Sequence, residues 1–316
     1  MAGFIYRRLS TLAEAFLPQR QVQWLRRVIR RRRVRRNEKA RARREERWGK
    51  QPDGGNIVVR LQSGVRMRLY RESVLCRYIY LDNFESAERQ FVNAFLKPGD
   101  VFVDVGANVG LFTLIAARQV GKRGYVYAFE PSGPTFERLR ENIYLNRFKN
   151  VSAFRLALSD SERTMELLRS KEGLDAWNSF APPYMGEEFF GETVAARTWD
   201  TFVRENRLNG RVTMMKIDVE GWEGRVLRGA ERELARPDAP VLQVEFTDEA
   251  AQAAGFSCRD LYGQLTELGY EVCRFDSENG QLVSDPIRAR YPYCNLFAVK
   301  DRKAAQHRLN AGLGIR

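Results

Sequence analysis

Three acidic residues lie at the ends of apolar runs in the second half of the chain, where they can form one chemical site. Asp218 and Glu220 belong to the stretch KIDVEGWEG, and Glu245 belongs to the run VLQVEF. Residues two apart on a continuing strand project to the same face of a sheet. The end of the next parallel strand lies beside them. The sequence therefore predicts that the three carboxylates cluster.

Such a cluster can do three kinds of chemistry. Mutual repulsion can raise the pKa of one carboxyl group, which then accepts a proton near neutral pH. The oxygens can also bind a divalent cation, or the acids can serve the fold alone. The single histidine, His307, lies in a polar tail, so a general base would be a carboxylate. We interpret Asp218, Glu220 and Glu245 as proton-accepting or substrate-positioning residues and assign no metal ligand. Glu223 is assigned instead to the first turn of a helix.

A second set of residues lies in the stretch DVGANVG and in the strand that follows it. Asp104 ends a predicted strand, Gly106, Asn108 and Gly110 form the turn into a helix, and Glu130 ends the next strand. Glycine and asparagine tolerate the positive φ angles of such a turn. A carboxylate at the strand end suits an ammonium group better than a diphosphate, and a later acid can accept the hydroxyls of a ribose. This combination points to S-adenosylmethionine as the ligand.

These residues need a scaffold of alternating strands and helices. A turn-forming break at 51–56 precedes a predicted hairpin over 56–70 and a helix over 85–96. Strand patterns follow at 101–106, 125–130, 151–158, 212–219, 240–246, 270–275 and 293–300, and helical patterns at 111–120, 132–146, 222–235 and 258–268. This alternation is typical of a parallel sheet covered by helices on both faces. Residues 169–192 have no clear period, which indicates a functional loop or lid.

Several motifs, in this order and spacing, resemble the FkbM family of class I S-adenosylmethionine-dependent methyltransferases. The motifs are FVDVGANVGLFTLIAA, VYAFEPSGPTFERLRENIYLN, ALSD, MKIDVEGWEGRVLRGA and VEF. The similarity covers about residues 85–300 and excludes the N-terminal arm. Asn108 departs from the G-x-G-x-G loop that is commoner in class I enzymes but suits FkbM-type sequences.

The resemblance implies a fold and residue roles. The expected fold is α/β, a doubly wound, seven-stranded, mostly parallel Rossmann-like sheet whose last strand is antiparallel. The loop from Asp104 to Gly110 would lie under the methionine end of the cofactor and Glu130 would hold the ribose. Asp218 would face the methyl-transfer site. Three residues at the end of the third strand would lie near the adenine: Ala157, Ser159 and Asp160.

The resemblance also implies O-methylation of a hydroxyl on a small-molecule or glycan acceptor, which includes sugars, glycolipids, polysaccharides and secondary metabolites. The alternative is a nucleic-acid (RNA) methyltransferase that uses its basic N-terminus to attract phosphates. The chain is expected to divide into a basic, partly amphipathic helical arm (1–50), a hairpin and helix cap (51–97), the methyltransferase domain (98–302) and a polar tail (303–316).

The positive charge of the chain is confined to the arm. Residues 1–50 hold 17 Lys/Arg and 4 Asp/Glu, a balance of 17 − 4 = +13, which equals the net charge of all 316 residues. The remaining body is therefore neutral and gives no electrostatic reason to expect a nucleic-acid partner. An amphipathic helix followed by an arginine block can lie on an anionic membrane. A solvated tail without a specific role is the alternative.

The cysteines and the hydropathy pattern indicate a cytoplasmic protein. Cys76, Cys258, Cys273 and Cys294 are scattered and contain no C-x-x-C pair, a pattern that favours reduced thiols. No apolar run reaches the length of a membrane-spanning helix, and the chain begins without an uninterrupted apolar signal region. We therefore expect a cytoplasmic location, with peripheral contact at the inner membrane surface if the arm binds lipid. The sequence does not indicate an oligomeric state.

Overall fold

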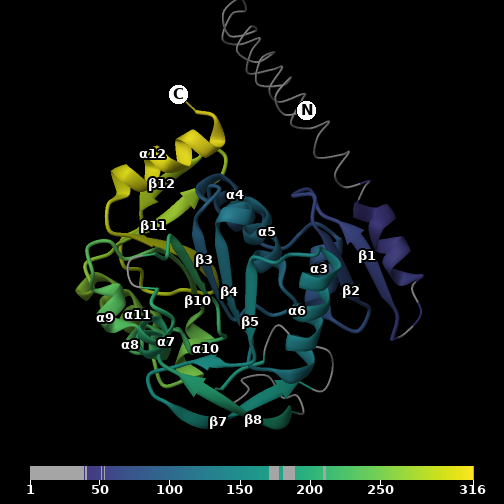
Figure 1. Cartoon of the computed structure of the whole chain (residues 1–316), viewed down its shortest axis with the longest axis horizontal. Helices are drawn as coiled ribbons and strands as arrows, with labels where there is room; N and C mark the ends of the chain where they lie inside the picture. Colours follow the sequence, from purple (N-terminus) through teal and green to yellow (C-terminus); the bar gives the residue numbers. More distant parts are fainter. Residues whose placement is uncertain are drawn as a thin grey trace, which may run out of the picture.

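The centre of the molecule is a large twisted sheet, and Figure 1 labels most of its strands. The computed structural model describes residues 39, 41–50, 52, 54–170, 178–180, 189–208 and 211–315. Within these residues the sheet has eight strands in the order β12-β11-β13-β10-β9-β3-β4-β5. The strands are β3 (Val101–Val105), β4 (Tyr125–Phe129), β5 (Val151–Phe154), β9 (Met214–Ile217), β10 (Val241–Phe246), β11 (Glu271–Asp276), β12 (Gln281–Ser284) and β13 (Cys294–Val299).

Five neighbouring strands, from β10 through β9, β3 and β4 to β5, run parallel, whereas β13 lies antiparallel between β10 and β11. This arrangement confirms the expected doubly wound, mostly parallel sheet with an antiparallel last strand. The extra edge strand β12 pairs with β11 through a short turn. The strand order reverses between β3 and β9, and ligands of doubly wound sheets bind at such a reversal.

Successive side chains of each strand point to opposite faces of the sheet and pack into two apolar layers. In β3, Phe102 packs on one face of the sheet, while Val103 and Val105 pack on the other. Both faces are covered by helices, which explains why the strands read as nearly continuous apolar runs. The first face carries α4 (Ser86–Phe95), α5 (Leu111–Val120) with the short η1 (Gly121–Arg123), α6 (Gly133–Leu145) and α12 (Arg302–Leu313). The second carries α7 (Trp199–Asn206), α8 (Glu223–Arg228), α9 (Glu231–Leu234), α10 (Asp248–Ala253) and α11 (Cys258–Glu267).

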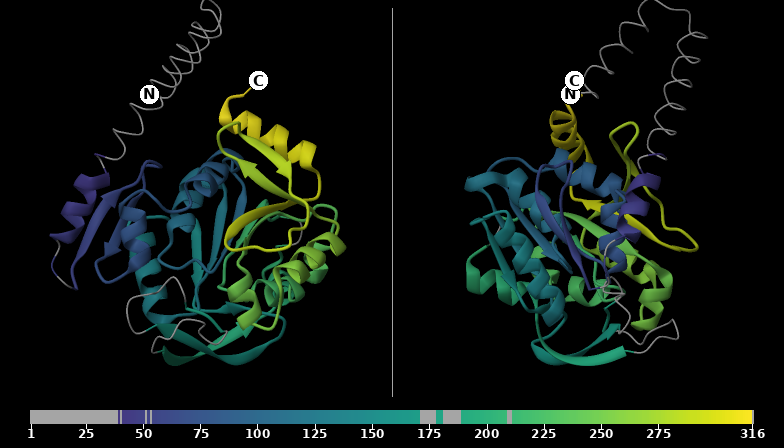
Figure 2. Two further views of the ribbon diagram at one scale, coloured as in Figure 1. Left: turned by 180° about the vertical axis from the view of Figure 1, so that it is seen from behind. Right: turned by 90° about the vertical axis from the view of Figure 1, so that its right-hand side faces the viewer.

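The N-terminal extension forms a small unit beside the main sheet (Figure 2). The predicted hairpin is present as β1 (Asn56–Arg60) and β2 (Arg66–Tyr70), and α3 (Val74–Tyr80) follows it. Residues 41–49 are helical, and Trp48 is buried against Tyr80. The end of the predicted arm therefore packs onto the extension, and the boundary at residue 50 stays a prediction. Residues 1–38 and 40 lie outside the described residues, so membrane contact by the arm stays a prediction.

A second sheet replaces the continuous third strand predicted over 151–158. Pairing in the main sheet ends at Phe154, and Ala157 pairs with Ala196 instead. The second sheet has the order β6-β8-β7 and consists of β6 (Ala157–Leu158), β7 (Arg163–Ser170) and β8 (Phe189–Arg197). The ends of the predicted loop 169–192 are therefore strand. Residues 171–177 and 181–188 lie outside the described part of the chain.

The C-terminal residues form helix α12 rather than the predicted polar tail. Ala305 and Leu309 are buried against α4, and a Cβ on Gly312 would lie 1.7 Å from the backbone oxygen of Ala94. The spacing of Ala305, Leu309 and Leu313 is one apolar stripe of a helix. The single histidine lies on this helix, far along the chain from the strand ends that carry the predicted site.

Two smaller expectations concern the cysteines and the membrane. All four thiols are free, and three of them are buried. In the part of the chain that the structure describes, each helix is too short or too polar to cross a bilayer.

Candidate active site

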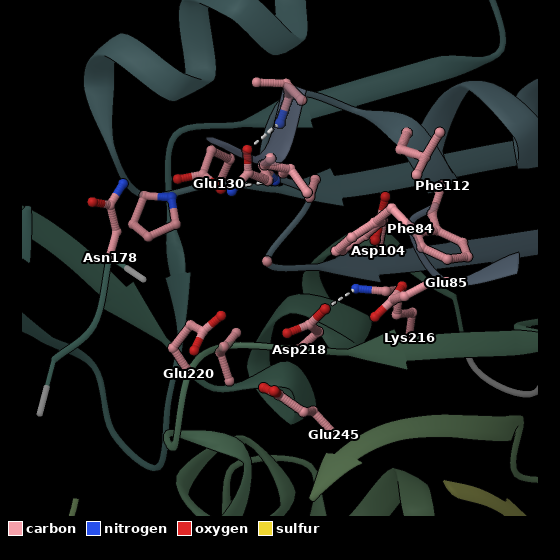
Figure 3. A pocket seen from close by; sticks show the side chains of 18 of the residues that line it. Phe84, Glu85, Asp104, Phe112, Glu130, Asn178, Lys216, Asp218, Glu220 and Glu245 are labelled. Carbon is pink, nitrogen blue, oxygen red and sulfur yellow. Dashed lines mark hydrogen bonds and ion pairs between the residues drawn. The ribbon is translucent and has the colours of Figure 1, made fainter. Parts of the chain in front are cut away.

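A cavity of about 300 Å³ opens where the carboxyl ends of β3 and β9 meet, at the reversal of the strand order. Figure 3 shows its side chains, which come from the extension, the loops after β3, β4 and β9, and strand β10. Seven of the eleven predicted site residues line it: Asp104, Gly106, Asn108, Glu130, Asp218, Glu220 and Glu245. The sequence motifs thus converge on one site, although they are spread over more than 140 residues of the chain.

The loop after β3 approaches the end of β9 closely. Gly106 has a φ of 78°, and a Cβ at this position would lie 1.8 Å from the backbone oxygen of Asp218. Only glycine fits both restraints. Asn108 also has a positive φ, and its backbone N–H donates to Oε2 of Glu130 over 2.9 Å. The loop therefore holds the acid of the next strand in place.

Asp104 and Glu130 are both buried and both face the cavity (Figure 3). Oδ2 of Asp104 accepts a hydrogen bond of 2.5 Å from Thr113, whereas its Oδ1 has no partner among the described residues. Burial raises the pKa of Asp104, and the nearby Lys216 opposes that shift. Oε1 of Glu130 accepts from the backbone N–H of Ser132. An unpaired buried acceptor costs free energy unless a ligand satisfies it.

Gly110 lies outside the cavity lining. It has a φ of 95° and precedes α5, and a Cβ there would lie 2.7 Å from Cδ1 of Leu139 in α6. Its role in this structure is the close packing of α5 against α6 rather than direct contact with the cavity.

Ala157, Ser159 and Asp160 also lie outside the cavity lining. Oγ of Ser159 accepts from the indole N–H of Trp222, and Asp160 forms an ion pair of 2.7 Å with Arg225. Through these contacts Ser159 and Asp160 stabilise the turn between β6 and β7. Their predicted contact with adenine stays a prediction. Leu167, Asn178 and Phe180 line the cavity instead.

Asp218 follows β9 directly and is held by a buried lysine. Nζ of Lys216 donates to Oδ2 of Asp218 over 2.6 Å, and the two residues form an ion pair. Burial alone would lower the pKa of Lys216, but Asp218, Glu85 and Asp104 together raise it. Lys216 therefore stays charged and is the single amine among the described residues that line the cavity.

Glu220 and Glu245 complete the predicted carboxylate cluster. One oxygen of each, and one of Asp218, lie within 4.8 Å of one another, close enough for a divalent cation to contact all three. The backbone that carries Glu220 is a turn rather than the continuing strand that we expected, because β9 ends at Ile217 and Glu220 has a φ of 53°. Burial and then Asp218 raise the pKa of Glu220, and burial and then Glu220 raise the pKa of Glu245.

Glu223 begins α8, as expected, but it is buried rather than exposed at the helix end. Its Oε1 accepts from the backbone N–H groups of Val219 and Gly221, 2.9 Å and 3.4 Å away. Burial, opposed by these hydrogen bonds, raises the pKa of Glu223 to about 7. The residue therefore stabilises the turn that carries Glu220.

The structure adds an acid that the sequence analysis did not select. Glu85 precedes α4 with a φ of 42°, and its side chain lines the cavity beside Lys216 (Figure 3). Its Oε1 accepts from the hydroxyl of Tyr293 over 3.1 Å and from Nδ2 of Asn295 over 2.8 Å. Among the described residues, Oε2 is buried without a hydrogen-bond partner. The partners lie more than 200 positions later in the chain, so no local pattern reveals the contact.

Apolar side chains form the wall of the cavity near Glu85. Most of them come from the N-terminal extension: Val74, Leu75, Tyr78 and Phe84. Phe112 and Phe180 contribute from α5 and from the segment after β7. Tyr78 is 43% exposed although it lines the cavity. The extension therefore covers one side of the cavity with a surface that fits an apolar or ring-shaped group.

Comparison with known proteins agrees with this geometry. The model of the FkbM methyltransferase domain matches residues 104–272, more than half of the chain. A relative from Streptomyces tacrolimicus, named 31-O-demethyl-FK506 methyltransferase FkbM, is 30% identical over 207 residues, which cover 56% of this chain and 73% of that protein.

Two fungal proteins are also similar. Methyltransferase sdnD of Sordaria araneosa is 28% identical over 187 residues, which cover 50% of this chain and 70% of that protein. Methyltransferase 1 of Beauveria bassiana is 29% identical over 152 residues, 43% of this chain, and the match spans 61% of the fungal protein's length. The chain therefore belongs to the FkbM family of methyltransferases.

Proposed function

We propose that the protein transfers a methyl group from S-adenosylmethionine to a hydroxyl oxygen of a sugar, glycolipid, polysaccharide or secondary metabolite. The observation that carries this proposal is the single cavity in which the loop after β3 faces a cluster of buried carboxylates at the ends of β9 and β10. The name of the Streptomyces relative, 31-O-demethyl-FK506 methyltransferase, specifies methylation at an oxygen, which supports the same reaction class for this protein.

The residues after β3 and β4 fit the proposed methyl donor. Oδ1 of Asp104 is a buried acceptor without a partner among the described residues, and an ammonium group would satisfy it. Backbone N–H groups of Asn108 and Ser132 donate to the two oxygens of Glu130 and fix this carboxylate at the cavity, where a ribose hydroxyl could donate to it. Asp104, Gly106, Asn108 and Glu130 would therefore hold the donor, and when bound it supplies a methyl group on a positively charged sulfur.

The residues of the other half would hold and activate the acceptor. A hydroxyl is a weak nucleophile at neutral pH, so a carboxylate within hydrogen-bond reach accelerates its reaction by about 10²–10⁴-fold. Glu220 and Glu245 have raised pKa values and in their protonated forms donate a hydrogen bond that orients an oxygen. The Lys216–Asp218 pair fixes the turn on which Glu220 lies. Alignment of the acceptor oxygen with the methyl group supplies much of the remaining rate.

The charge of the cavity argues against the RNA alternative. Among the described residues that line it, six carry carboxyl groups (Glu85, Asp104, Glu130, Asp218, Glu220 and Glu245) and one carries an amine. A phosphodiester backbone that entered this space would meet like charges, which are unfavourable in a site screened from water. A neutral hydroxyl compound meets no such repulsion.

Two measurements test the proposal. Calorimetry with S-adenosylhomocysteine should give a single binding event in the folded full-length protein, and its absence would refute the cofactor assignment. Incubation with methyl-labelled S-adenosylmethionine and separate glycolipid, polysaccharide, small-molecule and RNA fractions should then label one of the hydroxyl-rich fractions. Mass spectrometry of the product should locate an alkali-stable methyl ether. Label on RNA, on nitrogen or in an alkali-labile ester would overturn the proposal of O-methylation.

A further inference from the structure

Glu85 has the geometry of a functional acid rather than of a helix cap. It occupies the left-handed region with φ 42° and ψ 52°, makes no side-chain hydrogen bond to the helix that it precedes, and turns its carboxyl group into the cavity. A non-glycine residue in this region costs roughly 1–2 kcal/mol and persists where the surroundings require it. The backbone strain therefore serves the position of the side chain.

The hydrogen bonds of Glu85 place it on the acceptor side of the cavity. Of the two partners of Oε1, Tyr293 directly precedes β13 and Asn295 lies in β13, opposite Glu245 in the β10–β13 ladder. Glu85 is thereby tied to the strands that carry the carboxylate cluster and not to β3 and β4, which carry the cofactor residues. Its second oxygen, Oε2, is buried and has no partner among the described residues, and Glu85 lines the cavity together with the apolar side chains of the extension.

The other acids of this half are less suited to accept a proton. Asp218 is engaged by the ammonium of Lys216. Oε1 of Glu245 accepts a hydrogen bond from the hydroxyl of Thr247, and the residue is 5% exposed. Burial and then Glu220 raise the pKa of Glu245 well above its usual value. Burial and then Asp218 likewise raise the pKa of Glu220 well above its usual value. Among the described acids that line the cavity, Glu85 has one oxygen held by two donors and a buried second oxygen without a partner.

We propose that Glu85 is the general base of the methyl transfer and that Tyr293 and Asn295 position it. This inference rests on the proposed function. Glu85 takes the proton of the acceptor hydroxyl while that oxygen forms its bond to the methyl carbon. The carbon–sulfur bond breaks in the same step, and its electron pair remains on the sulfur, which becomes a neutral thioether. The proton later leaves Glu85 to solvent.

The electrostatic surroundings of Glu85 are consistent with this role. Burial raises its pKa to about 7, Lys216 from β9 lowers it, and Asp218 and Glu88 raise it. The donors on Oε1 favour the charged form, so their removal moves the pKa upward. The active, deprotonated form therefore appears as the pH rises through about 7, and turnover is expected to rise with it.

The test compares Glu85→Gln and Tyr293→Phe with the control Glu88→Gln in the full-length protein. Glu88 lies on the same helix, and its carboxyl group is outside the cavity lining. Calorimetry with S-adenosylhomocysteine reports whether the cofactor half is intact. Infrared titration of the ligand-free protein reports the carboxyl groups that lose their protons near pH 7. Turnover against pH is measured with the acceptor fraction that becomes labelled by the wild-type protein.

Glu85→Gln should bind S-adenosylhomocysteine as the wild type does and lose about 10²–10⁴-fold of turnover. It should also lose one of the carboxyl signals that titrate near pH 7 and keep the signal of Glu223. Tyr293→Phe should shift both the infrared titration and the turnover profile to higher pH, which a purely structural hydroxyl would not do. Glu88→Gln removes a charge that raises the pKa of Glu85, so it should shift both profiles to lower pH, opposite to Tyr293→Phe, without the large loss of turnover. Tenfold weaker binding of S-adenosylhomocysteine by Glu85→Gln would make Glu85 a cofactor ligand and overturn the inference, as would full turnover. Neither result would change the cofactor assignment itself.

Discussion

The two halves of the cavity are built in different ways. The half formed by β3, β4 and their loops takes its residues from one continuous segment, in which Asp104 and Glu130 are 26 positions apart. The opposite half combines the extension, the ends of β9 and β10, and the segment before β13 (Figure 3). In the first half backbone geometry holds a small set of polar groups. In the second half side chains from distant elements form a buried charge cluster beside an apolar wall.

This difference indicates which part is common and which part is specific. A loop whose backbone N–H groups and glycine fix one acid can hold the same donor in many proteins. The acceptor half depends on an N-terminal extension that lies outside the matched family domain of residues 104–272. Substrate choice is therefore expected to reside in the extension and in the carboxylates that it covers.

The largest effect on stability is expected where the two halves of the cavity meet, at the close approach of Gly106 to the residue that follows β9. Gly106→Ala should lower the free energy of unfolding by about 4 kcal/mol or more, because the new methyl group meets the Asp218 backbone oxygen at 1.8 Å. The control is Gly99→Ala, which shares a positive φ but has free space around the added Cβ. It should cost about 1–2 kcal/mol. Equal losses in urea unfolding would show that backbone strain, and not the close approach, makes Gly106 necessary.

The next effect concerns Lys216, whose charge faces acids of both halves. Lys216→Met should destabilise the protein by about 3–5 kcal/mol, because it leaves buried carboxylates without a counter-charge. At low pH protonated carboxyl groups need no counter-charge, so the defect should be smaller at about pH 5 than at about pH 8. Urea unfolding at both values measures this, with Lys300→Met, outside the cavity, as the control. A defect independent of pH would mean that packing, not charge, explains the loss.

A third prediction separates Asp104 from Asp160 in the cofactor half. Asp104→Asn should weaken S-adenosylhomocysteine binding by about 10–150-fold, since a hydrogen bond between charged groups contributes about 1.5–3 kcal/mol. Asp160→Asn should change the affinity little, because that carboxylate pairs with Arg225 outside the cavity lining. Calorimetry of both variants decides the point. Comparable weakening by Asp160→Asn would support the adenine contact that the family resemblance implies.

The smallest effect is expected at the apolar wall of the acceptor half. Tyr78→Ala should raise the KM for the acceptor by about fivefold, because the lost apolar contact contributes about 1 kcal/mol of binding free energy. Binding of S-adenosylhomocysteine should be unchanged. Tyr144→Ala is the matched control, because Tyr144 is 86% exposed on α6 and does not line the cavity. If Tyr78→Ala weakens cofactor binding but not the acceptor KM, the two halves are assigned the wrong way round.

Much of the fold follows from local signals in the sequence. The helix predicted over 111–120 is α5 with the same bounds, and the strands around Asp104, Glu130 and Glu245 lie where their apolar runs indicate. Short-range spacing suffices for these elements because strand and helix periodicity is a property of neighbouring residues. The same reasoning missed α12, whose stripe of Ala305, Leu309 and Leu313 is diluted by polar residues, and it joined β5 to β6 across Arg155 and Leu156.

The sequence by itself determined the class of the protein and the cofactor half of the site, because Asp104, Gly106, Asn108 and Glu130 lie in one strand–turn–helix unit whose geometry is local. Only the tertiary structure decided the other half. The contact of Glu85 with Asn295 spans 210 positions and depends on where α4 and β13 dock against the same sheet. Burial of the carboxylates, and therefore their raised pKa values, is likewise a consequence of packing between distant elements. No spacing along the chain encodes it.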